Sequence, residues 1–248
     1  MKIGIYGGSF NPIHYGHIET AKYLINEGIV DNIGMVLNPC SSFKRNVKMP
    51  DAYHRAVMMQ KAIDENNCCS IQVDITEMIN SIHNNGVCYT VDTLKEILYR
   101  NIYSYYGREP DEFYLIIGTD VFNNIKKFKH WHWFLEEKLV KLIILPRGGY
   151  TIDEDLKKEF SEIILEWDSS NFVPCTVSST FIRDSIKSGN IDNIGGISCS
   201  VRDYIKEHKL YGYTGDDEDK KEKIIEKYII EAEERIIETK KLLEENEI

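Results

Sequence analysis

Residues 2–17, KIGIYGGSFNPIHYGH, decide the fold of this chain. The apolar, partly β-branched run at 2–6 predicts a short strand that ends at a pair of glycines. From about residue 17 to residue 26, HIETAKYLIN, apolar residues recur at helical spacing, and Gly28 is a suitable helix stop. A strand, a glycine turn and a helix in this order indicate the first part of a βαβ unit.

The same alternation continues along the chain. Further strands are predicted at 33–37, 70–75, 113–117, 140–145 and 161–165, and further helices at 51–64, 90–101 and 179–187. Strands that alternate with helices indicate a parallel sheet, and near-continuous apolar strands are typical of a sheet covered on both faces. We therefore predict that residues 1–213 form one Rossmann-like, doubly wound parallel α/β domain. Ligands of such sheets bind beyond the carboxyl ends of the strands.

The composition is that of an ordinary globular chain. Of its 248 residues, 42% are hydrophobic and 28% charged, which excludes a chain that is disordered throughout. The formal net charge of −10 argues against a general nucleic-acid-binding protein but not against a nucleotide enzyme. Because the sequence has neither a secretory signal nor an apolar run of membrane-helix length, we expect a cytoplasmic protein without a membrane partner. The six cysteines have no CxxC or zinc spacing, so reduced thiols are expected.

The composition changes after Tyr213. Residues 214–248 contain thirteen acidic and seven basic residues, so this segment holds −6 of the −10 charge. Its apolar residues lie mostly three and four positions apart, the spacing of a short coiled-coil seam, at Ile225, Ile229, Ala232, Ile236 and Leu243. We predict a charged helical tail. It either packs one stripe on its own domain or pairs with a second copy of the chain in a homo-oligomer.

The segment 7–17 predicts an anion-binding site. Gly7 and Gly8 allow a tight turn and a close approach of the backbone to a ligand. His14 and His17 lie three residues apart at a helix start, so we expect their imidazoles to lie close together beside the unpaired N–H groups of the first turn. This group suits a polyphosphate. The dinucleotide fingerprint GxGxxG is absent, and the alternative, a metal held by the two histidines, lacks a third ligand nearby in the sequence.

A second phosphate-binding segment is predicted at 178–183, SSTFIR. Ser178, Ser179 and Thr180 place hydroxyl groups and unpaired amides at a helix start. Arg183 follows Ser179 by four residues and therefore shares its face of the helix, and arginine is the side chain best shaped for phosphate oxygens. Taken alone, the segment is equally consistent with a serine-capped helix that bears a surface arginine.

A third turn, Gly118-Thr119-Asp120, follows the strand predicted at 113–117. Its glycine lets a ribose approach, and its carboxylate can accept hydrogen bonds from two sugar hydroxyls.

Together these segments resemble a known family. GGSFNPIHYGH at 7–17 is similar to the (H/T)xGH signature of the nucleotidyltransferase superfamily, and its GSFNP element resembles that of the bacterial nicotinate mononucleotide adenylyltransferases. VSSTFIR resembles the ISSTxIR signature of the same family, GTD its GxD, and GVCYTVDTL at 86–94 its GxSYTxDTL, with Cys88 where serine is usual. The resemblance covers residues 1 to about 211 and leaves the tail outside it.

The resemblance implies roles for individual residues. The implied catalytic residues are His14, His17 and Arg183. The implied ATP-binding residues are Gly7, Gly8, Ser9, Phe10, His14, His17, Gly118, Asp120, Arg147, Ser178, Ser179 and Arg183. The implied mononucleotide-binding residues are Lys44, Tyr89, Thr90 and Trp131, with Trp133 as the alternative ring that stacks on the pyridine. The resemblance implies Mg²⁺ as cofactor, held through the ATP phosphates and without a protein ligand.

The implied activity is transfer of the adenylyl group of ATP to nicotinate mononucleotide, which forms nicotinate adenine dinucleotide and pyrophosphate in NAD biosynthesis. Alternatives on the same scaffold use nicotinamide mononucleotide or phosphopantetheine as acceptor, or CTP in place of ATP. A non-catalytic nucleotide sensor is an alternative of another class. The presence of His14, His17 and Arg183 argues against it, because a sensor does not need groups that stabilise a transition state.

Overall fold

The computed structural model describes residues 1–39, 49–83, 88–104 and 111–214 of the chain. The strands in these ranges are β1 (Lys2–Gly8), β2 (Asn32–Leu37), β3 (Ile71–Asp74), β4 (Glu112–Gly118) and β5 (Val140–Leu145). The α-helices are α1 (Tyr15–Asn26), α2 (Ala52–Glu65), α3 (Thr76–His83), α4 (Thr90–Ser104), α5 (Thr119–Phe122), α6 (Trp133–Glu137), α7 (Glu154–Glu159), α8 (Ser179–Lys187) and α9 (Cys199–Glu207). Lys44 and the tail from residue 215 onward lie outside the described residues.

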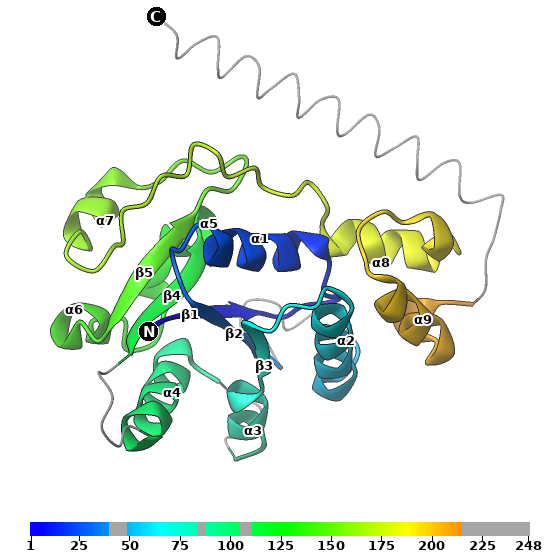
Figure 1. Ribbon diagram of the computed structural model, residues 1–248, viewed down its shortest axis with the longest axis horizontal. Helices are drawn as coiled ribbons and strands as arrows, with labels where there is room; N and C mark the ends of the chain where they lie inside the picture. Colours follow the sequence, from blue (N-terminus) through cyan, green and yellow to red (C-terminus); the bar gives the residue numbers. More distant parts are fainter. Residues whose placement is uncertain (40–48, 84–87, 105–110, 215–248) are drawn as a thin grey trace, which may run out of the picture.

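The strands form one parallel sheet in the order β3-β2-β1-β4-β5 (Figure 1). The chain runs outward from β1 to β3 on one side and then returns to place β4 and β5 on the other. The order therefore reverses between β1 and β4, which is the point where open parallel sheets bind ligands. This confirms the predicted doubly wound parallel sheet.

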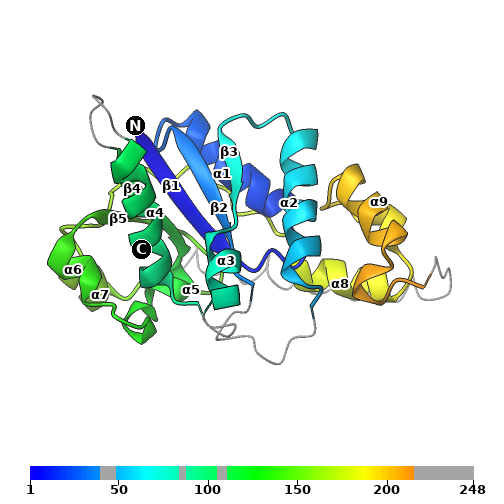
Figure 2. The same cartoon turned by 90° about the horizontal axis from the view of Figure 1, so that it is seen from below.

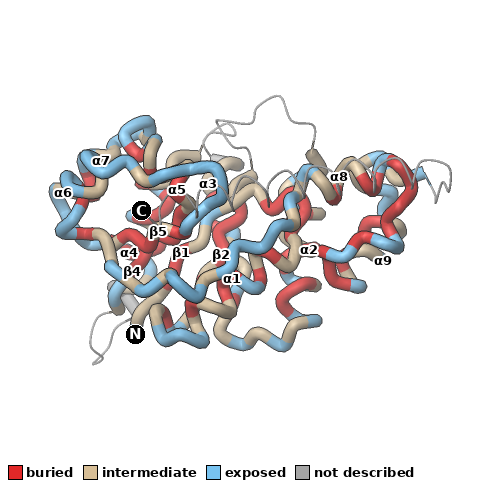
Figure 3. Tube along the Cα trace, turned by 90° about the horizontal axis from the view of Figure 1, so that it is seen from above, coloured by how far each residue is buried: buried red, intermediate tan, exposed pale blue. Residues whose placement is uncertain are grey.

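The sheet separates two hydrophobic cores, because alternate side chains of each strand point to opposite faces. On β4, Tyr114 and Ile116 pack in a core with α1, α2, α8 and α9, whereas Phe113, Leu115 and Ile117 pack in a second core with α4. Figure 2 shows α3 and α4 on the near side of the sheet and α1 on the far side. Figure 3 shows the buried residues along the strands, with exposed residues on the outer surfaces of the helices.

The prediction of a strand at 161–165 is wrong. These residues form a turn in which only Ile164 bridges to Leu142 of β5. The Leu142 amide donates to the carbonyl of Ile163 at 2.7 Å, and the Leu165 amide donates back to Leu142 at 2.8 Å. Ile163 is only 1% exposed. The short apolar run therefore covers the edge of the core as a turn, and periodicity alone does not distinguish such a run from a strand.

Helix boundaries were predicted with mixed success. The structure has the helix predicted at 179–187 over the same residues. The carboxylate of Asp51 caps α2 by accepting from the amide of His54 at 2.9 Å, as its place before the helix predicted at 51–64 led us to expect. Helix α1 begins at residue 15, two residues earlier than expected. Thr90, which the sequence led us to expect as the cap of the helix at 90–101, is instead the first residue of α4. Among the described residues, no helix is both long enough and apolar enough to cross a bilayer.

Candidate active site

The loop between β1 and α1 lies at the carboxyl end of the sheet. Phe10 has a positive φ of 40° and is only 2% exposed, so its ring lies in the core. That ring meets the imidazole of His17 edge-on, with 5.0 Å between centroids. The Phe10 ring therefore packs against the His17 ring on its buried side. Because the ring is buried, any contact of Phe10 with a ligand has to use its backbone.

The two histidines at the start of α1 lie face to face. Their ring centroids are 3.8 Å apart and the planes are tilted by 34°, which confirms the proximity predicted from their spacing. The backbone N–H of His14 donates to Nδ1 of His17 at 3.2 Å. Because Nδ1 accepts this hydrogen bond, the proton of a neutral His17 ring lies on Nε2. His17 is thereby oriented as a donor through Nε2.

Gly16 makes room for this pair. A Cβ atom at residue 16 would lie 2.9 Å from two atoms of the His14 ring and 3.1 Å from Cβ of Cys175. A side chain there would displace the ring or the segment around residue 175. The glycine between the histidines is therefore required by a close approach of side chains to the helix start.

His14 is held in its neutral form. Burial lowers the pKa of its imidazole from the ordinary 6.5 to about 4, and the positive charge of Arg147 lowers it further in the same direction. Its Nδ1 is buried without a hydrogen-bond partner among the described residues. At neutral pH His14 is therefore a hydrogen-bonding group without a full charge.

The start of α8 is bound to the same loop. One guanidinium nitrogen of Arg183 donates to the carbonyl of Asn11 at 2.8 Å, and the Ser179 hydroxyl donates to the carbonyl of Pro12 at 3.0 Å. Ser178 caps the helix by accepting from the amide of Phe181 at 3.2 Å. The two segments predicted to bind phosphate, which are far apart in the sequence, therefore meet at one place. Figure 1 shows the starts of α1 and α8 side by side.

The turn after β4 places a carboxylate beside an arginine from the end of β5. Nη1 of Arg147 lies 3.4 Å and 3.3 Å from the two carboxylate oxygens of Asp120. A Cβ atom at Gly118 would lie 2.6 Å from Oδ1 of Asp120. The glycine at the strand end therefore allows the position of the carboxylate. Arg147 connects this turn electrostatically to His14.

The residues predicted to bind the mononucleotide lie near α4 and α6. Tyr89 and Thr90 are half-buried at the start of α4, and Nζ of Lys129 lies 4.1 Å from the centroid of the Tyr89 ring. Trp131 is half-buried and stacks on His132, with 3.7 Å between centroids. Trp133 is only 8% exposed and belongs to the second core. Of the two tryptophans, Trp131 is therefore the more exposed, and Nζ of Lys126 lies 5.1 Å from the centroid of its ring.

A buried arginine that holds two loops of the site together by hydrogen bonds was not identified from the sequence. Arg55 of α2 is 1% exposed. Its guanidinium donates to the carbonyls of Ser9 at 2.6 Å, Asn38 at 2.8 Å and Pro39 at 2.6 Å. Arg55 thus ties the loop after β1 to the loop after β2. The sequence DAYHRAVM at 51–58 indicates only a helix of the scaffold, and no spacing rule connects its arginine to carbonyls of two distant loops.

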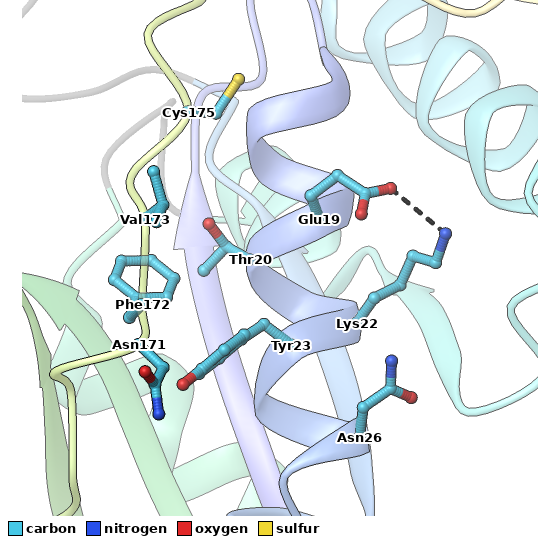
Figure 4. A pocket seen from close by; sticks show the side chains of 9 residues that line it. All are labelled: Glu19, Thr20, Lys22, Tyr23, Asn26, Asn171, Phe172, Val173 and Cys175. Carbon is cyan, nitrogen blue, oxygen red and sulfur yellow. Dashed lines mark hydrogen bonds and ion pairs between the residues drawn. The ribbon is translucent and has the colours of Figure 1, made fainter.

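Two cavities lie away from these residues. The first, of about 280 Å³, runs along the outer face of α1 (Figure 4). Its walls are the side chains of α1 from Glu19 to Asn26 and the segment from Asn171 to Cys175. The second, of about 320 Å³, lies between the sheet and α4 near the starts of the strands. No residue predicted to bind ATP lines either cavity.

The chain is similar in sequence to several known proteins. The family model described as Cytidylyltransferase-like matches residues 5–185. The nicotinate-nucleotide adenylyltransferase of Bacillus subtilis is 29% identical over 213 residues, which cover 85% of this chain and 98% of that protein. A Fusobacterium nucleatum protein named "Probable nicotinate-nucleotide adenylyltransferase" is 31% identical, with 79% of this chain and 92% of that protein covered.

A solved structure has a similar fold. Plasmodium falciparum nicotinic acid mononucleotide adenylyltransferase complexed with NaAD superimposes with a TM-score of 0.66 and 25% identity. The superposition covers 86% of this chain and 98% of the other. By fold and by sequence, the chain is therefore a nucleotidyltransferase. It belongs to the Cytidylyltransferase-like family and, within that family, to the nicotinate-nucleotide adenylyltransferases.

Proposed function

We propose that this chain transfers the adenylyl group of ATP to nicotinate mononucleotide and releases pyrophosphate, as an enzyme of NAD biosynthesis. The observation that supports this most directly is the convergence of two helix starts. Arg183 and Ser179 of α8 donate to the carbonyls of Asn11 and Pro12, three and two residues before His14. Two helix N-termini that face one loop supply unpaired N–H groups and partial positive charge, which together can neutralise one triphosphate.

The reaction joins two phosphates. An oxygen of the mononucleotide 5′-phosphate attacks the α-phosphorus of ATP, a new P–O bond forms, and the bond from the α-phosphorus to the oxygen of the β-phosphate breaks. The attacking phosphate is already an anion near pH 7, so no general base is required. Catalysis then depends on position and on stabilisation of charge at the α-phosphorus.

The histidine pair is proposed to bind the α- and β-phosphates. His17 donates through Nε2, since its Nδ1 accepts from the His14 backbone at 3.2 Å. His14 acts as a neutral donor, because its pKa is lowered to about 4. A neutral imidazole beside an imidazole 3.8 Å away avoids the repulsion that two imidazolium rings would feel. His17 is assigned the larger share of transition-state stabilisation.

The start of α8 is proposed to hold the leaving pyrophosphate. Ser178, Ser179 and Arg183 present two hydroxyls and a guanidinium there. One guanidinium nitrogen of Arg183 is fixed by Asn11, and the other donates to the Thr180 hydroxyl at 3.0 Å. The side chain is therefore already oriented before a ligand binds, which reduces the entropy lost on binding.

The remaining residues are proposed to bind the two nucleosides. Gly118 and Asp120 take the ATP ribose, and Arg147 lies near the adenine. Tyr89 and Thr90 at the start of α4 bind the acid group of the acceptor, while the Trp131 ring stacks on the pyridine. Lys44, outside the described residues, is proposed as a phosphate contact.

Mg²⁺ is proposed to accompany ATP. The residues at the phosphate end are imidazoles, hydroxyls and a guanidinium, which donate hydrogen bonds to phosphate and are not the oxygen anions that Mg²⁺ prefers. The donor set therefore fits an ion held by phosphate oxygens and water. When bound, the ion neutralises negative charge on the triphosphate.

A pyrophosphate-release assay tests the function. With ATP and Mg²⁺, nicotinate mononucleotide is expected to give the highest kcat/KM among nicotinate mononucleotide, nicotinamide mononucleotide and phosphopantetheine. Preference for either other acceptor would reassign the substrate. Release with none of the three, together with ATP binding, would support a nucleotide sensor instead.

A His17→Ala variant tests the role of the histidine. Loss of one charge-stabilising donor is expected to lower kcat roughly 10²–10³-fold at saturating substrates. His208→Ala, which removes the histidine that directly follows α9 and lies outside the proposed site, is the control and should keep the parent kcat. Near-parent turnover of the His17→Ala variant would refute this role.

A further inference from the structure

A buried glutamate lies beneath the segment proposed to bind the acceptor. Glu77, in the first turn of α3, is 6% exposed. The thiol of Cys88 donates to its backbone carbonyl at 3.0 Å, and the hydroxyl of Thr93 in α4 lies 3.2 Å from Oε1 of its carboxyl group. Glu77 therefore contacts both the residue before Tyr89 and the first turns of α4. The mechanism proposed above does not use it.

The surroundings of Glu77 disfavour its charge. Burial raises the pKa of the Glu77 carboxyl from 4.5 to about 7, and the negative charge of Asp74 raises it further, while the Thr93 hydroxyl acts in the opposite direction. Arg100 of α4 lies 3.5 Å from Asp74 of β3 and also donates to the Thr76 hydroxyl. Its positive charge is therefore directed to Asp74.

The remaining features are a second acidic side chain between α3 and α4 and one oxygen of the Glu77 carboxyl group itself. Glu96, also on α4, accepts from Asn80 at 2.6 Å and adds a second acidic side chain between α3 and α4. The second carboxyl oxygen of Glu77, Oε2, is buried and has no hydrogen-bond partner among the described residues. If Glu77 is ionised, this oxygen loses its hydration, and no hydrogen bond among the described residues replaces the lost water. Near neutral pH, both protonation states of Glu77 are therefore accessible.

Thr93 makes the protonation state of Glu77 matter for the acceptor segment. Its hydroxyl oxygen lies 3.2 Å from Oε1 of Glu77 and 3.3 Å from the backbone carbonyl of Tyr89. A hydroxyl has one hydrogen, so it donates to only one of these acceptors at a time. A carboxylate attracts that hydrogen more strongly than a carbonyl does. A protonated Glu77 donates to the Thr93 oxygen and leaves the Thr93 hydrogen for Tyr89.

We propose that Glu77 is a positioning residue for the acceptor. As a neutral acid it leaves the Thr93 hydroxyl bound to the Tyr89 carbonyl, which also accepts from the Thr93 backbone amide at 3.1 Å, and this pair of hydrogen bonds keeps residues 88–90 in the arrangement that binds the nicotinate group. As a carboxylate it withdraws that hydrogen bond, places a negative charge behind the segment, and weakens binding of an anionic acceptor. This inference rests on the proposed function, because it takes residues 88–90 as the acceptor-binding segment.

The test compares the parent with Glu77→Gln, whose side chain has nearly the same shape and stays neutral. Affinity for nicotinate mononucleotide is measured by calorimetry, and KM and kcat by pyrophosphate release, from pH 6 to pH 8. We expect the KM of the parent for this acceptor to rise about fivefold relative to that of Glu77→Gln over this range, the factor given by one hydrogen bond of about 1 kcal/mol. The acceptor phosphate titrates equally in both proteins, so the comparison removes its effect.

Three controls accompany this test. Glu96→Gln removes a neighbouring carboxylate and should keep the pH profile of the parent. With nicotinamide mononucleotide, which lacks the ring carboxylate, the rise with pH should be smaller. The KM for ATP should not change with Glu77→Gln, because no proposed ATP contact touches this network.

Parallel pH profiles of KM in the parent and in Glu77→Gln would overturn the inference. If Glu77→Gln does not fold, Thr93→Val provides the same comparison, because it removes the hydroxyl that connects Glu77 to Tyr89. A parent that releases no pyrophosphate with nicotinate mononucleotide contradicts the proposed function instead. In that case the calorimetric pH profile still decides whether Glu77 controls binding.

Discussion

At the scale of single residues, the site depends on groups whose surroundings change their ordinary chemistry. His14 and His17 have the same side chain, yet one is neutral by burial and the other is oriented by a backbone N–H. Their spacing along the helix predicted the contact between the rings. It did not predict the lowered pKa of His14, because burial depends on elements that the sequence places far away.

The His14 imidazole predicts a pH dependence of stability. Its pKa is about 4 in the folded protein against an ordinary 6.5, so the unfolded chain binds more protons between these values. The free energy of unfolding should therefore decrease as the pH falls from 6.5 to 4. Thermal unfolding of the parent and of His14→Gln, whose side chain does not titrate, measures this contribution as a difference. Equal pH slopes in the two proteins would contradict it.

Gly118 predicts a defect in ATP binding. In Gly118→Ala the new Cβ would lie 2.6 Å from Oδ1 of Asp120, so the carboxylate has to move from the position proposed for the ribose contact. Loss of a hydrogen bond to a charged group should raise the KM for ATP about tenfold or more. Gly148→Ala is the matched control, because nothing lies within 4 Å of a Cβ atom there. An equal KM in both variants would remove Asp120 from the site.

At the scale of elements, α8 combines a structural role and a proposed chemical role. For its capping residue, Ser178, we predict an effect on ATP binding that can be distinguished from a loss of stability. Ser178→Ala should lower the free energy of unfolding by about 1 kcal/mol and also raise the KM for ATP. Ser198→Ala removes the cap of α9, where Ser198 accepts from the amide of Val201 at 3.4 Å, and should lower stability alone. Equal kinetic effects in the two variants would show that Ser178 only caps its helix.

Elements with strong local signals were predicted well. The helix from Ser179 to Lys187 has a serine cap and a clear apolar face, and its bounds were predicted correctly. The strand predicted at 113–117 lies within the observed β4, because a buried parallel strand is a near-continuous apolar run. The helices α3 and α9, of eight and nine residues, were not predicted. The helices α5, α6 and α7 were also missed, because each has only four to six residues, too few for a periodic pattern.

Contacts between distant segments account for most of what the sequence could not supply. The hydrogen bonds of Arg55 to carbonyls of the loops after β1 and β2 and the arrangement of Glu77 with Thr93 depend on which helices pack against which strand ends. Motif resemblance identified the residues at the strand ends because their types and order are specific. It gave no indication of the buried groups that hold those residues in place.

At the scale of the whole molecule, we predict that the tail can be removed without loss of activity. The Bacillus subtilis relative is matched over 98% of its length by 85% of this chain. We propose that residues 1–213 are the nucleotidyltransferase domain and that the charged tail is an addition to it. A chain that ends at Thr214 should keep the parent kcat and thermal midpoint. Sedimentation of both forms then shows whether the tail joins copies of the chain, and loss of activity on truncation would contradict the domain boundary.

The hydrogen bonds that join α8 to the first loop have a consequence for biosynthesis. They connect residues 167 and 172 positions apart in the sequence. While the ribosome is still adding the middle of the chain, the nascent polypeptide has its histidine pair but no partner for it. Adenylylation competence should therefore arise abruptly, when the last third of the polypeptide leaves the exit tunnel, and not increase gradually with length.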